Sequence, residues 1–300
     1  MRTYLTPAQD ESLQRYKRAR QSIRTPIDHP TIAYAGTAGS YAEEAAIAFF
    51  GEDRRRLAHG SFADVFKSLT GGGADYGVLP IENSSTGSIA AVYDLLSHYT
   101  CSIVGEIPIE VHHCLLALPG ATLEGLTEIY SHEQGFFQSQ EFLSRHPRWK
   151  CVPWSNTAVA ARMVADSGNR AYGAIASARA AQIHGLTILA EDINSSDINS
   201  TRFVVVSPVP ERRPGRDKIS LIFRLPHRTG ALYRLLGIFE AHHLNLCKIE
   251  SRPLPGVNWE YLFFLDFLGA AACDDLDAVL MEVLAATEQF YFLGSYPPFG

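Results

Sequence analysis

The sequence EDINSSDINSTRFVVV, residues 191–206, joins a polar, turn-rich segment to a run of β-branched residues. The run predicts a short buried strand, with Thr201, Arg202 and Phe203 at its mouth. Threonine offers a weakly acidic hydroxyl there, and the planar guanidinium of arginine matches a carboxylate. For these three residues alone, a solvated arginine beside a threonine that caps a turn is the simpler interpretation. The rest of the chain decides between the two.

The composition is that of a globular protein with room for two domains, since 46% of its 300 residues are hydrophobic and 19% are charged. A formal net charge of -6 argues against a nucleic-acid or membrane-surface partner. The five cysteines are scattered and form no C-x-x-C pair, which favours a reduced, cytoplasmic protein. No apolar run approaches the roughly 18 residues of a membrane-spanning helix. The histidines have no metal-site spacing, so we expect neither a membrane span nor a bound metal.

Residues 1–30 predict one accessory helix on the surface. Thr6 is a suitable cap, Pro7 fits the first turn, and Gln9 stands three residues after the cap. The apolar stripe that follows is thin, and the pattern ends before Pro26. This N-terminal extension is too short to form a catalytic domain.

Between residues 31 and 208 one unit recurs: a short apolar strand, a turn of small or polar residues, and a capped helix. Strands are predicted at 32–35, 76–79, 128–130, 151–154 and 171–175. Ser40 and Glu43 predict a capping box, Pro80–Gly87 predicts a turn, and one helix is expected to carry Phe136 and Phe142. This alternation is typical of an α/β domain with largely parallel sheets.

Two extended segments, 102–110 and 111–118, interrupt the alternation. They predict a crossing between two lobes, with residues of about 111–184 as the second lobe. In open α/β sheets, ligands bind off the carboxyl ends of the strands, where helix N-termini present unpaired N–H groups. The Ser-, Thr- and Asn-rich turns at that edge therefore predict an interlobe cleft for a small polyanion.

A Pro- and Arg-rich linker, 209–217, precedes a different pattern. Strands are predicted at 218–225, 244–251, 259–267 and 290–293, and amphipathic helices at 230–243 and 274–287. This β-α-β-β-α-β order over 218–300 is the ferredoxin-like arrangement. Because the linker separates two self-contained patterns, a chain that ends near Pro208 is expected to fold alone.

Taken together, the motifs resemble prephenate dehydratase with a C-terminal ACT regulatory domain, over residues 31–300. They are GxxGSYAE at 36–43, LPIENS at 79–84 with Gly87, SHxQ at 131–134, NTA at 156–158, NxTRF at 199–203, GAL at 230–232 and ESRP at 250–253. Ser40-Tyr41-Ala42 departs from the family's usual Thr-Phe-Ser, and Glu133 and Thr229 each stand where a proline is common. Glu133 adds a negative charge near the expected pocket, and Thr229 lies where an effector would bind.

The resemblance implies a two-lobed α/β catalytic domain, like that of periplasmic binding proteins, and a lyase of phenylalanine biosynthesis. Such an enzyme converts prephenate to phenylpyruvate, with loss of CO2 and water, and needs no cofactor. Thr201 would protonate the departing hydroxyl, and Arg202 and helix N-termini would hold the carboxylates. The implied catalytic residues are Thr201, Arg202, Ser131 and His132. The implied substrate-binding residues are Ser40, Glu82, Asn83, Ser84, Gly87, Gln134, Asn156, Thr157 and Phe203.

The resemblance also implies L-phenylalanine as feedback effector, bound between the ACT domains of a homodimer or homotetramer. The implied effector-binding residues are Gly230, Ala231, Leu232, Asn245, Glu250, Ser251, Arg252 and Pro253. Two alternatives stay open: an arogenate dehydratase, whose substrate has an amino group in place of the keto group, and a non-catalytic amino-acid sensor. Purely structural roles also stay open for the individual residues: His132 and Glu82 as helix caps, Phe203 as core, and Ser84, Ser131 and Thr157 as partners of backbone groups.

Overall fold

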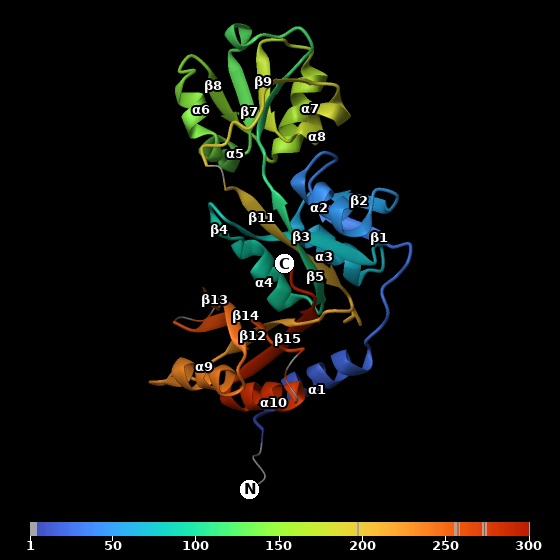
Figure 1. Cartoon of the computed structure of the whole chain (residues 1–300), viewed down its shortest axis with the longest axis vertical. Helices are drawn as coiled ribbons and strands as arrows, with labels where there is room; N and C mark the ends of the chain where they lie inside the picture. Colours follow the sequence, from blue (N-terminus) through green and yellow to red (C-terminus); the bar gives the residue numbers. More distant parts are fainter. Residues whose placement is uncertain are drawn as a thin grey trace. The chain divides into compact units, whose positions relative to one another are not determined.

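The computed structural model describes residues 5–196, 198–254, 257, 259–271, 273 and 275–299 (Figure 1). The chain forms two compact units. The α/β unit comprises His29–Val92 and Ile107–Val204, and the C-terminal unit comprises Met1–Asp28, Tyr93–Glu106 and Val205–Gly300. This division assigns the N-terminal helix and residues 93–106 to the C-terminal unit. The predicted domain limits, which keep 31–208 together, remain predictions.

The first sheet contains the strand that carries Thr201. Its strands are β1 (Thr31–Ala35), β2 (Arg55–His59), β3 (Tyr76–Asn83), β4 (Gly87–Ser88), β5 (Ser102–Glu110) and β11 (Ser200–Ser207). Their order is β2-β1-β3-β11-β5, with β4 paired to β3, and β1 runs parallel to β2 and β3. The accompanying helices are α2 (Tyr41–Phe50), α3 (Phe62–Thr70) and α4 (Ala90–His98). β3 runs on to Asn83, where a turn was predicted from Pro80, because Glu82 and Asn83 pair with Ser88 and Gly87 in a hairpin.

The second sheet is mixed, which corrects the prediction of largely parallel sheets. Its order is β10 (Thr187–Ala190), β6 (Cys114–Ala117), β9 (Tyr172–Ala176), β7 (Glu128–Ser131) and β8 (Lys150–Pro153). β7 is parallel to β8 and β9, whereas β6 is antiparallel to β9 and β10. The antiparallel partners of β6 are β9 and β10, which come more than 50 residues later in the chain, so its direction follows from long-range pairing that local alternation of strands and helices does not reveal. A short 3-10 helix, Leu123–Gly125, precedes β7.

Helices cover both faces of the second sheet (Figure 1). Cys114 and Leu116 of β6 belong to a core cluster with α7 (Thr157–Ser167) and α8 (Ala178–His184). Leu115 and Ala117 belong to the opposite cluster, which packs against α5 (Glu133–Gln138) and α6 (Gln140–Ser144). Successive side chains of one strand point to opposite faces, which explains the alternation. The single helix predicted through Phe136 and Phe142 is broken at Ser139, which caps the end of α5 and the start of α6.

The loop before α2 is held by Glu43. Ser40 caps α2 by accepting a hydrogen bond from the Glu43 amide, but the Glu43 carboxylate accepts from the Gly39 amide, at 2.8 Å, so the predicted capping box is displaced by one residue. Gly39 has φ +83, and a Cβ there would lie 2.8 Å from the Cα of Ala180. This position therefore requires glycine for both its backbone angle and the close approach of α8.

The C-terminal unit has the predicted ferredoxin-like element order. Its elements are β12 (Lys218–Arg224), α9 (Ala231–Ala241), β13 (Asn245–Pro253), β14 (Tyr261–Leu268), α10 (Leu276–Ala286) and β15 (Gln289–Tyr296). The antiparallel sheet has the order β13-β14-β12-β15, and α9 and α10 cover one of its faces (Figure 1). Asp275 caps α10; Asp274, the predicted first residue of that helix, lies outside the described residues.

The N-terminal helix, α1 (Pro7–Gln21), packs on this C-terminal core. The capping box of Thr6 and Gln9 forms as predicted. Tyr16 is only 6% exposed and belongs to the core cluster of β12, β14, β15, α9 and α10. The helix therefore packs one narrow face on the core of the C-terminal unit, while its other residues are exposed or half-buried. Among the helices that the structure describes, none combines the length and apolar character needed to span a bilayer.

Candidate active site

A cavity of about 530 Å³ in the α/β unit gathers many of the predicted site residues. Thr201 and His132, predicted to be catalytic, lie in its wall. So do the predicted substrate-binding residues Ser40, Asn83, Gln134, Asn156, Thr157 and Phe203. They come from β3, β11 and the starts of α2, α5 and α7. The size suits a drug-sized or smaller ligand.

The alternation of side chains along β11 separates the two residues that the sequence placed together. Thr201 and Phe203 line the cavity, whereas Arg202 lies outside its lining. Arg202 donates from Nη2 to Glu82 Oε2 at 3.0 Å. Glu82 is itself the neighbour of cavity-lining Asn83 on β3, so the ion pair and the cavity lie on opposite faces of two adjacent strands. Arg202 and Glu82 therefore lie outside the wall of this cavity, and their predicted roles toward a substrate stay predictions.

The Thr201 hydroxyl is held by an amide. Asn83 Nδ2 donates to Thr201 Oγ1 at 2.9 Å and to Asn199 Oδ1 at 2.9 Å, and Thr201 and Asn83 are 8% and 7% exposed. A hydroxyl has one proton and two acceptor lone pairs. Because Thr201 Oγ1 accepts from Asn83, its own proton is left for another acceptor in the cavity. The arrangement suits a proton donor.

The Asn83 side chain is fixed in turn by the backbone. Its Oδ1 accepts from the amide N–H groups of Ser85, at 2.9 Å, and Thr86, at 3.1 Å. Backbone N–H groups cannot rotate away, so they determine which side of the Asn83 amide faces Thr201. Asn83 is thus a rigid donor to Thr201.

His132 and Ser131 occupy the end of β7 and the start of α5. His132 is the N-cap of α5 and accepts from the Gln134 amide through Nδ1, at 3.2 Å, so one of its ring nitrogens has a structural role. Ser131 is fully buried, and its hydroxyl donates to the Ile175 carbonyl at 2.8 Å, outside the cavity lining. Ser131 thus ties β7 to β9, and its predicted catalytic role stays a prediction.

The cavity wall is largely apolar, and its polar groups belong to a limited set of side chains. Within the described part of the chain, its lining residues include no Asp, Glu, Lys or Arg. Asn156 caps α7 by accepting from the amides of Ala158 and Val159, at 2.8 and 3.4 Å, and Ser40 caps α2. Any anion bound here would meet neutral donors and the positive ends of helix dipoles rather than a lysine or arginine.

Two further predicted residues lie outside the wall. The Ser84 amide donates to the Ser200 carbonyl at 2.9 Å, and Ser84 Oγ accepts from the Ser200 amide at 3.0 Å, so Ser84 joins β3 to β11. Gly87 has φ +78 and pairs with Asn83 in the β3–β4 hairpin. Both residues shape the backbone that presents Asn83.

Sequence reasoning missed several lining residues, among them Tyr41, Thr86, Ser88, His113, Gln138 and Ser155. His113 is 2% exposed and burial lowers its pKa, so the ring is neutral at pH 7. Its Nε2 lies 2.8 Å from Gln138 Oε1, and its Nδ1 lies 3.1 Å from the Tyr41 hydroxyl. The available signal was position: His113 lies within the predicted crossing segments, directly before β6.

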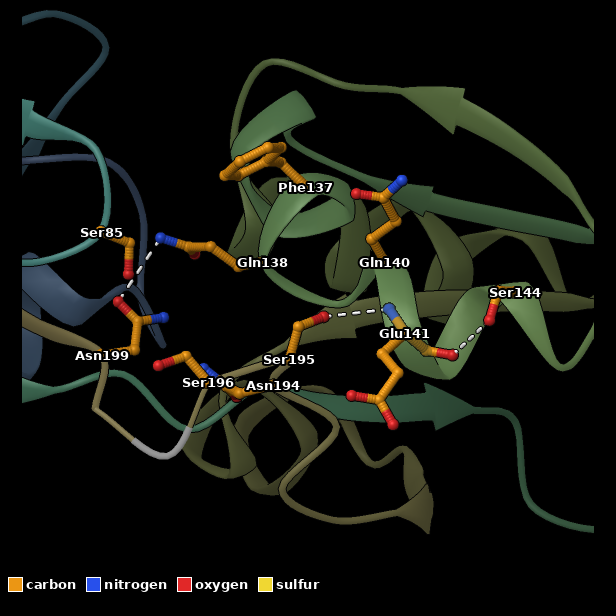
Figure 2. A pocket seen from close by; sticks show the side chains of 10 residues that line it. All are labelled: Ser85, Phe137, Gln138, Gln140, Glu141, Ser144, Asn194, Ser195, Ser196 and Asn199. Carbon is orange, nitrogen blue, oxygen red and sulfur yellow. Dashed lines mark hydrogen bonds between the residues drawn. The ribbon is translucent and has the colours of Figure 1, made fainter.

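A second cavity, of about 450 Å³, lies beside Gln138 (Figure 2). In Figure 2, the Gln138 amide reaches Asn199 Oδ1, at 3.4 Å, while Ser195 accepts from the Glu141 amide, at 3.0 Å. Gln138 thus stands in the wall between the two cavities. No group of three or more His, Cys, Asp or Glu side chains that could hold a metal was found among the described residues.

A family model described as prephenate dehydratase matches residues 32–211 of this sequence, which is more than half of the chain. The chain belongs to the prephenate dehydratase family. The match includes β3, β11 and every residue of the cavity wall.

Individual relatives agree with this assignment. The chain is 36% identical over 293 residues to the bifunctional chorismate mutase/prephenate dehydratase of Neisseria gonorrhoeae, which covers 97% of this chain and 81% of that protein. It is 37% identical over 285 residues to arogenate dehydratase 3 of Arabidopsis thaliana, a chloroplastic protein, covering 89% of this chain and 66% of that one.

Two solved structures share the fold with a TM-score of 0.81 each. One is the prephenate dehydratase of Arthrobacter aurescens in complex with L-Phe, 30% identical, with 89% of each chain covered. The other is GqqA, described as a novel type of quorum quenching acylase, 32% identical, with 90% of this chain and 98% of that chain covered.

The residues implied for effector binding lie in the C-terminal unit, at two separate places. Ala231 and Leu232 line a cavity of about 480 Å³ with Pro226, Trp259 and Tyr261. Gly230 has φ +77 and precedes α9, a conformation that favours glycine.

The other implied residues lie on β13. Pro253 pairs with Tyr261 and so ends near this cavity, whereas Asn245 pairs with Leu268 at the opposite end of the strand. Arg252 forms an ion pair with Asp94 of α4, at 3.1 Å, and Glu250 and Ser251 precede it. One chain alone therefore does not bring Asn245 to the cavity of Leu232.

Proposed function

We propose that the cavity of the α/β unit converts prephenate to phenylpyruvate, CO2 and water. The observation that carries the proposal is the Thr201 hydroxyl, which accepts from Asn83 at 2.9 Å and keeps its proton for a ligand. The C–C bond to the ring carboxylate breaks, its electron pair enters the ring, and the 4-hydroxyl leaves as water with the proton of Thr201. Solvent restores that proton. Aromatisation of the ring supplies the driving force, so a donor as weak as threonine is adequate.

The lack of lysine and arginine in the described wall supports this reaction. A carboxylate that becomes CO2 loses its charge in the transition state, so strong pairing with an arginine would stabilise the substrate more than the transition state. Neutral donors such as Asn156, Ser40 and Gln134, with helix N-termini, hold a dianion with less bias towards the ground state. On this view Arg202 contributes through its pair with Glu82 and not through the substrate.

Arogenate is the second candidate substrate, because an arogenate dehydratase is among the relatives. Its ammonium group would call for an anionic partner, and the described wall of the cavity contains no Asp or Glu. The keto group of prephenate makes no such demand. We therefore expect kcat/KM for prephenate to exceed that for arogenate.

The test is turnover of both substrates by the purified protein, with phenylpyruvate and phenylalanine as the respective products. Faster turnover of arogenate would replace the first proposal by the second. If neither substrate were consumed, the non-catalytic sensor would stand.

For the C-terminal unit we propose an ACT domain that binds L-phenylalanine and mediates homo-oligomer formation. Three observations support it: the βαββαβ order, Gly230 at the start of α9, and the separation of Asn245 from the Leu232 cavity, which a second chain could bridge. The complex of L-Phe with a relative agrees with this effector. The five free cysteines agree with a cytoplasmic location.

Calorimetry with phenylalanine tests the effector site, on the wild type and on Gly230→Leu. The leucine would strain the backbone at φ +77, so binding should be lost while turnover of prephenate persists. Equal binding to both proteins would place the effector elsewhere.

A further inference from the structure

Five buried or half-buried polar side chains form a continuous series in the wall of the cavity: Tyr41, His113, Gln138, Asn83 and Thr201. These side chains come from α2, the residue before β6, the end of α5, β3 and β11. They are far apart in sequence, and hydrogen bonds connect each to the next. The series ends at the proposed proton donor.

The direction of every amide in the series follows from the backbone. The amides of Ser85 and Thr86 fix Asn83 Oδ1, so Asn83 Nδ2 faces Asn199 Oδ1 and Thr201. Two oxygens, Asn83 Oδ1 and Asn199 Oδ1, then face Gln138, and both accept from its Nε2 at 3.4 Å. The carbonyl oxygen of Gln138 is left on the other side, where it meets His113.

His113 must therefore be a donor at Nε2. Gln138 Oε1 has only lone pairs to offer, and it lies 2.8 Å from that nitrogen. A neutral ring with its proton on Nε2 has an acceptor at Nδ1. The Tyr41 hydroxyl lies 3.1 Å from that nitrogen but donates to the His112 carbonyl at 2.8 Å, so the orientation of Gln138, and not Tyr41, assigns this tautomer. Tyr41 keeps its own proton at neutral pH, since burial raises its pKa well above the ordinary value. The tautomer of His113 and the orientation of Gln138 thus determine each other.

We propose that His113 is a positioning residue: its Nε2–H holds the amide of Gln138 in the one orientation that supports the Asn83–Thr201 pair. The inference rests on the proposed dehydratase function, whose proton donor is Thr201. If the Nε2–H group of His113 is removed, Gln138 Oε1 loses its short hydrogen bond and the Gln138 amide is free to rotate. A rotation by half a turn would bring Gln138 Oε1 against two other oxygens, Asn83 Oδ1 and Asn199 Oδ1. The repulsion would move Asn83, and with it the hydroxyl of Thr201, by a fraction of an ångström or more.

Two substitutions at His113 distinguish the loss of its hydrogen-bond donor from the loss of its side-chain volume. His113→Leu removes the donor and keeps an apolar side chain of similar reach. His113→Gln places an amide Nε2–H close to where the imidazole Nε2–H was. We expect His113→Leu to lower kcat for prephenate by roughly 10- to 100-fold, the loss that a small misplacement of a reacting group causes, with KM changed little. His113→Gln should recover most of that loss.

His184→Leu is the matched control. His184 is another histidine of the α/β unit whose pKa burial lowers, and it lies outside the cavity lining. Its replacement should leave kcat for prephenate unchanged. A comparable loss in His184→Leu would show that removing any buried histidine is enough, and would overturn the proposal.

A double-mutant cycle with Gln138→Ala tests whether His113 acts on Thr201 through Gln138. If His113 acts through Gln138, then His113→Leu should cost almost nothing further once Gln138 is alanine. Additive losses would contradict this route, as would a His113→Leu variant with the kcat of the wild type. Failure of the proposed function is a different result, because the wild-type protein itself would then not consume prephenate.

Discussion

Thr201 is a weak acid placed where a proton is needed, and its neighbours define which way that proton points. Asn83 donates to its oxygen, and backbone amides hold Asn83. The residue therefore does not depend on a shifted pKa. It depends on orientation, and on a reaction whose product is aromatic.

Replacement of the Thr201 hydroxyl should lower kcat far more than it raises KM. Thr201→Val keeps the volume and removes the donor, so we expect kcat for prephenate to fall by about 10²–10⁴, the usual contribution of a positioned proton donor. Thr201→Ser keeps the hydroxyl and should stay much closer to the wild type. Steady-state kinetics on the three proteins provide the measurement, and a Val variant with wild-type kcat would remove Thr201 from the mechanism.

At the scale of the element, the period of two along a β-strand decides which neighbours share a site. On β11, Thr201 and Phe203 face the cavity and Arg202 does not; on β3, Asn83 faces it and Glu82 does not. The Arg202–Glu82 pair is half-buried, with side chains 19% and 36% exposed. It therefore joins β3 to β11 behind the site.

Arg202→Gln tests this assignment. Because the guanidinium is outside the cavity, KM for prephenate should change by less than about threefold, while stability falls by about 1 kcal/mol or less, as for a partly exposed ion pair. A glutamine that stays near Glu82 keeps one hydrogen bond. If KM instead rose by about two orders of magnitude with unchanged thermal stability, Arg202 would be shown to bind a substrate carboxylate.

Local signals in the sequence predicted the helices and strands well. Contacts between residues far apart in the sequence were predicted only in part. Caps at Thr6 and Ser40 mark real helix starts, because a cap and its helix are neighbours in sequence. The β-branched run after Thr201 is a buried strand for the same reason. His113 and Gln138 gave no comparable signal, since their partners lie more than 20 residues away and meet only after the fold has formed.

The C-terminal sheet was predictable as a pattern but its contacts were not. The alternation of apolar and polar residues predicted all four strands of 218–300. No pattern in residues 93–106 indicated that they belong to the same compact unit as that sheet. Tyr93 stacks edge-on against Phe264, with ring centroids 4.6 Å apart. Lys218 Nζ donates to both carboxylate oxygens of Glu106, at 3.0 and 2.8 Å, with side chains 10% and 4% exposed. The backbone of Gly294 also approaches Ile103 so closely that a Cβ would collide with its carbonyl oxygen.

At the scale of the whole molecule, these contacts argue against the expectation that a chain ending near Pro208 folds alone, and the experiment below tests it. Truncation there would remove Phe264 from Tyr93 and Lys218 from Glu106, and Tyr93 and Glu106 are 3% and 7% exposed in the full chain. Exposing a large apolar side chain costs about 1.5–3 kcal/mol, and leaving one member of a buried ion pair uncompensated, here Glu106, costs about 3–5 kcal/mol. The sum is comparable with the whole stability of a domain, about 5–15 kcal/mol.

We expect residues 1–208 to be aggregated or to melt far below the full chain. The matched control is a full-length chain cleaved within 209–217, which keeps every one of these contacts and should retain both its melting temperature and its turnover of prephenate. A soluble 1–208 fragment with full activity and the melting temperature of the intact chain would show that residues 93–106 fold with the α/β unit after all.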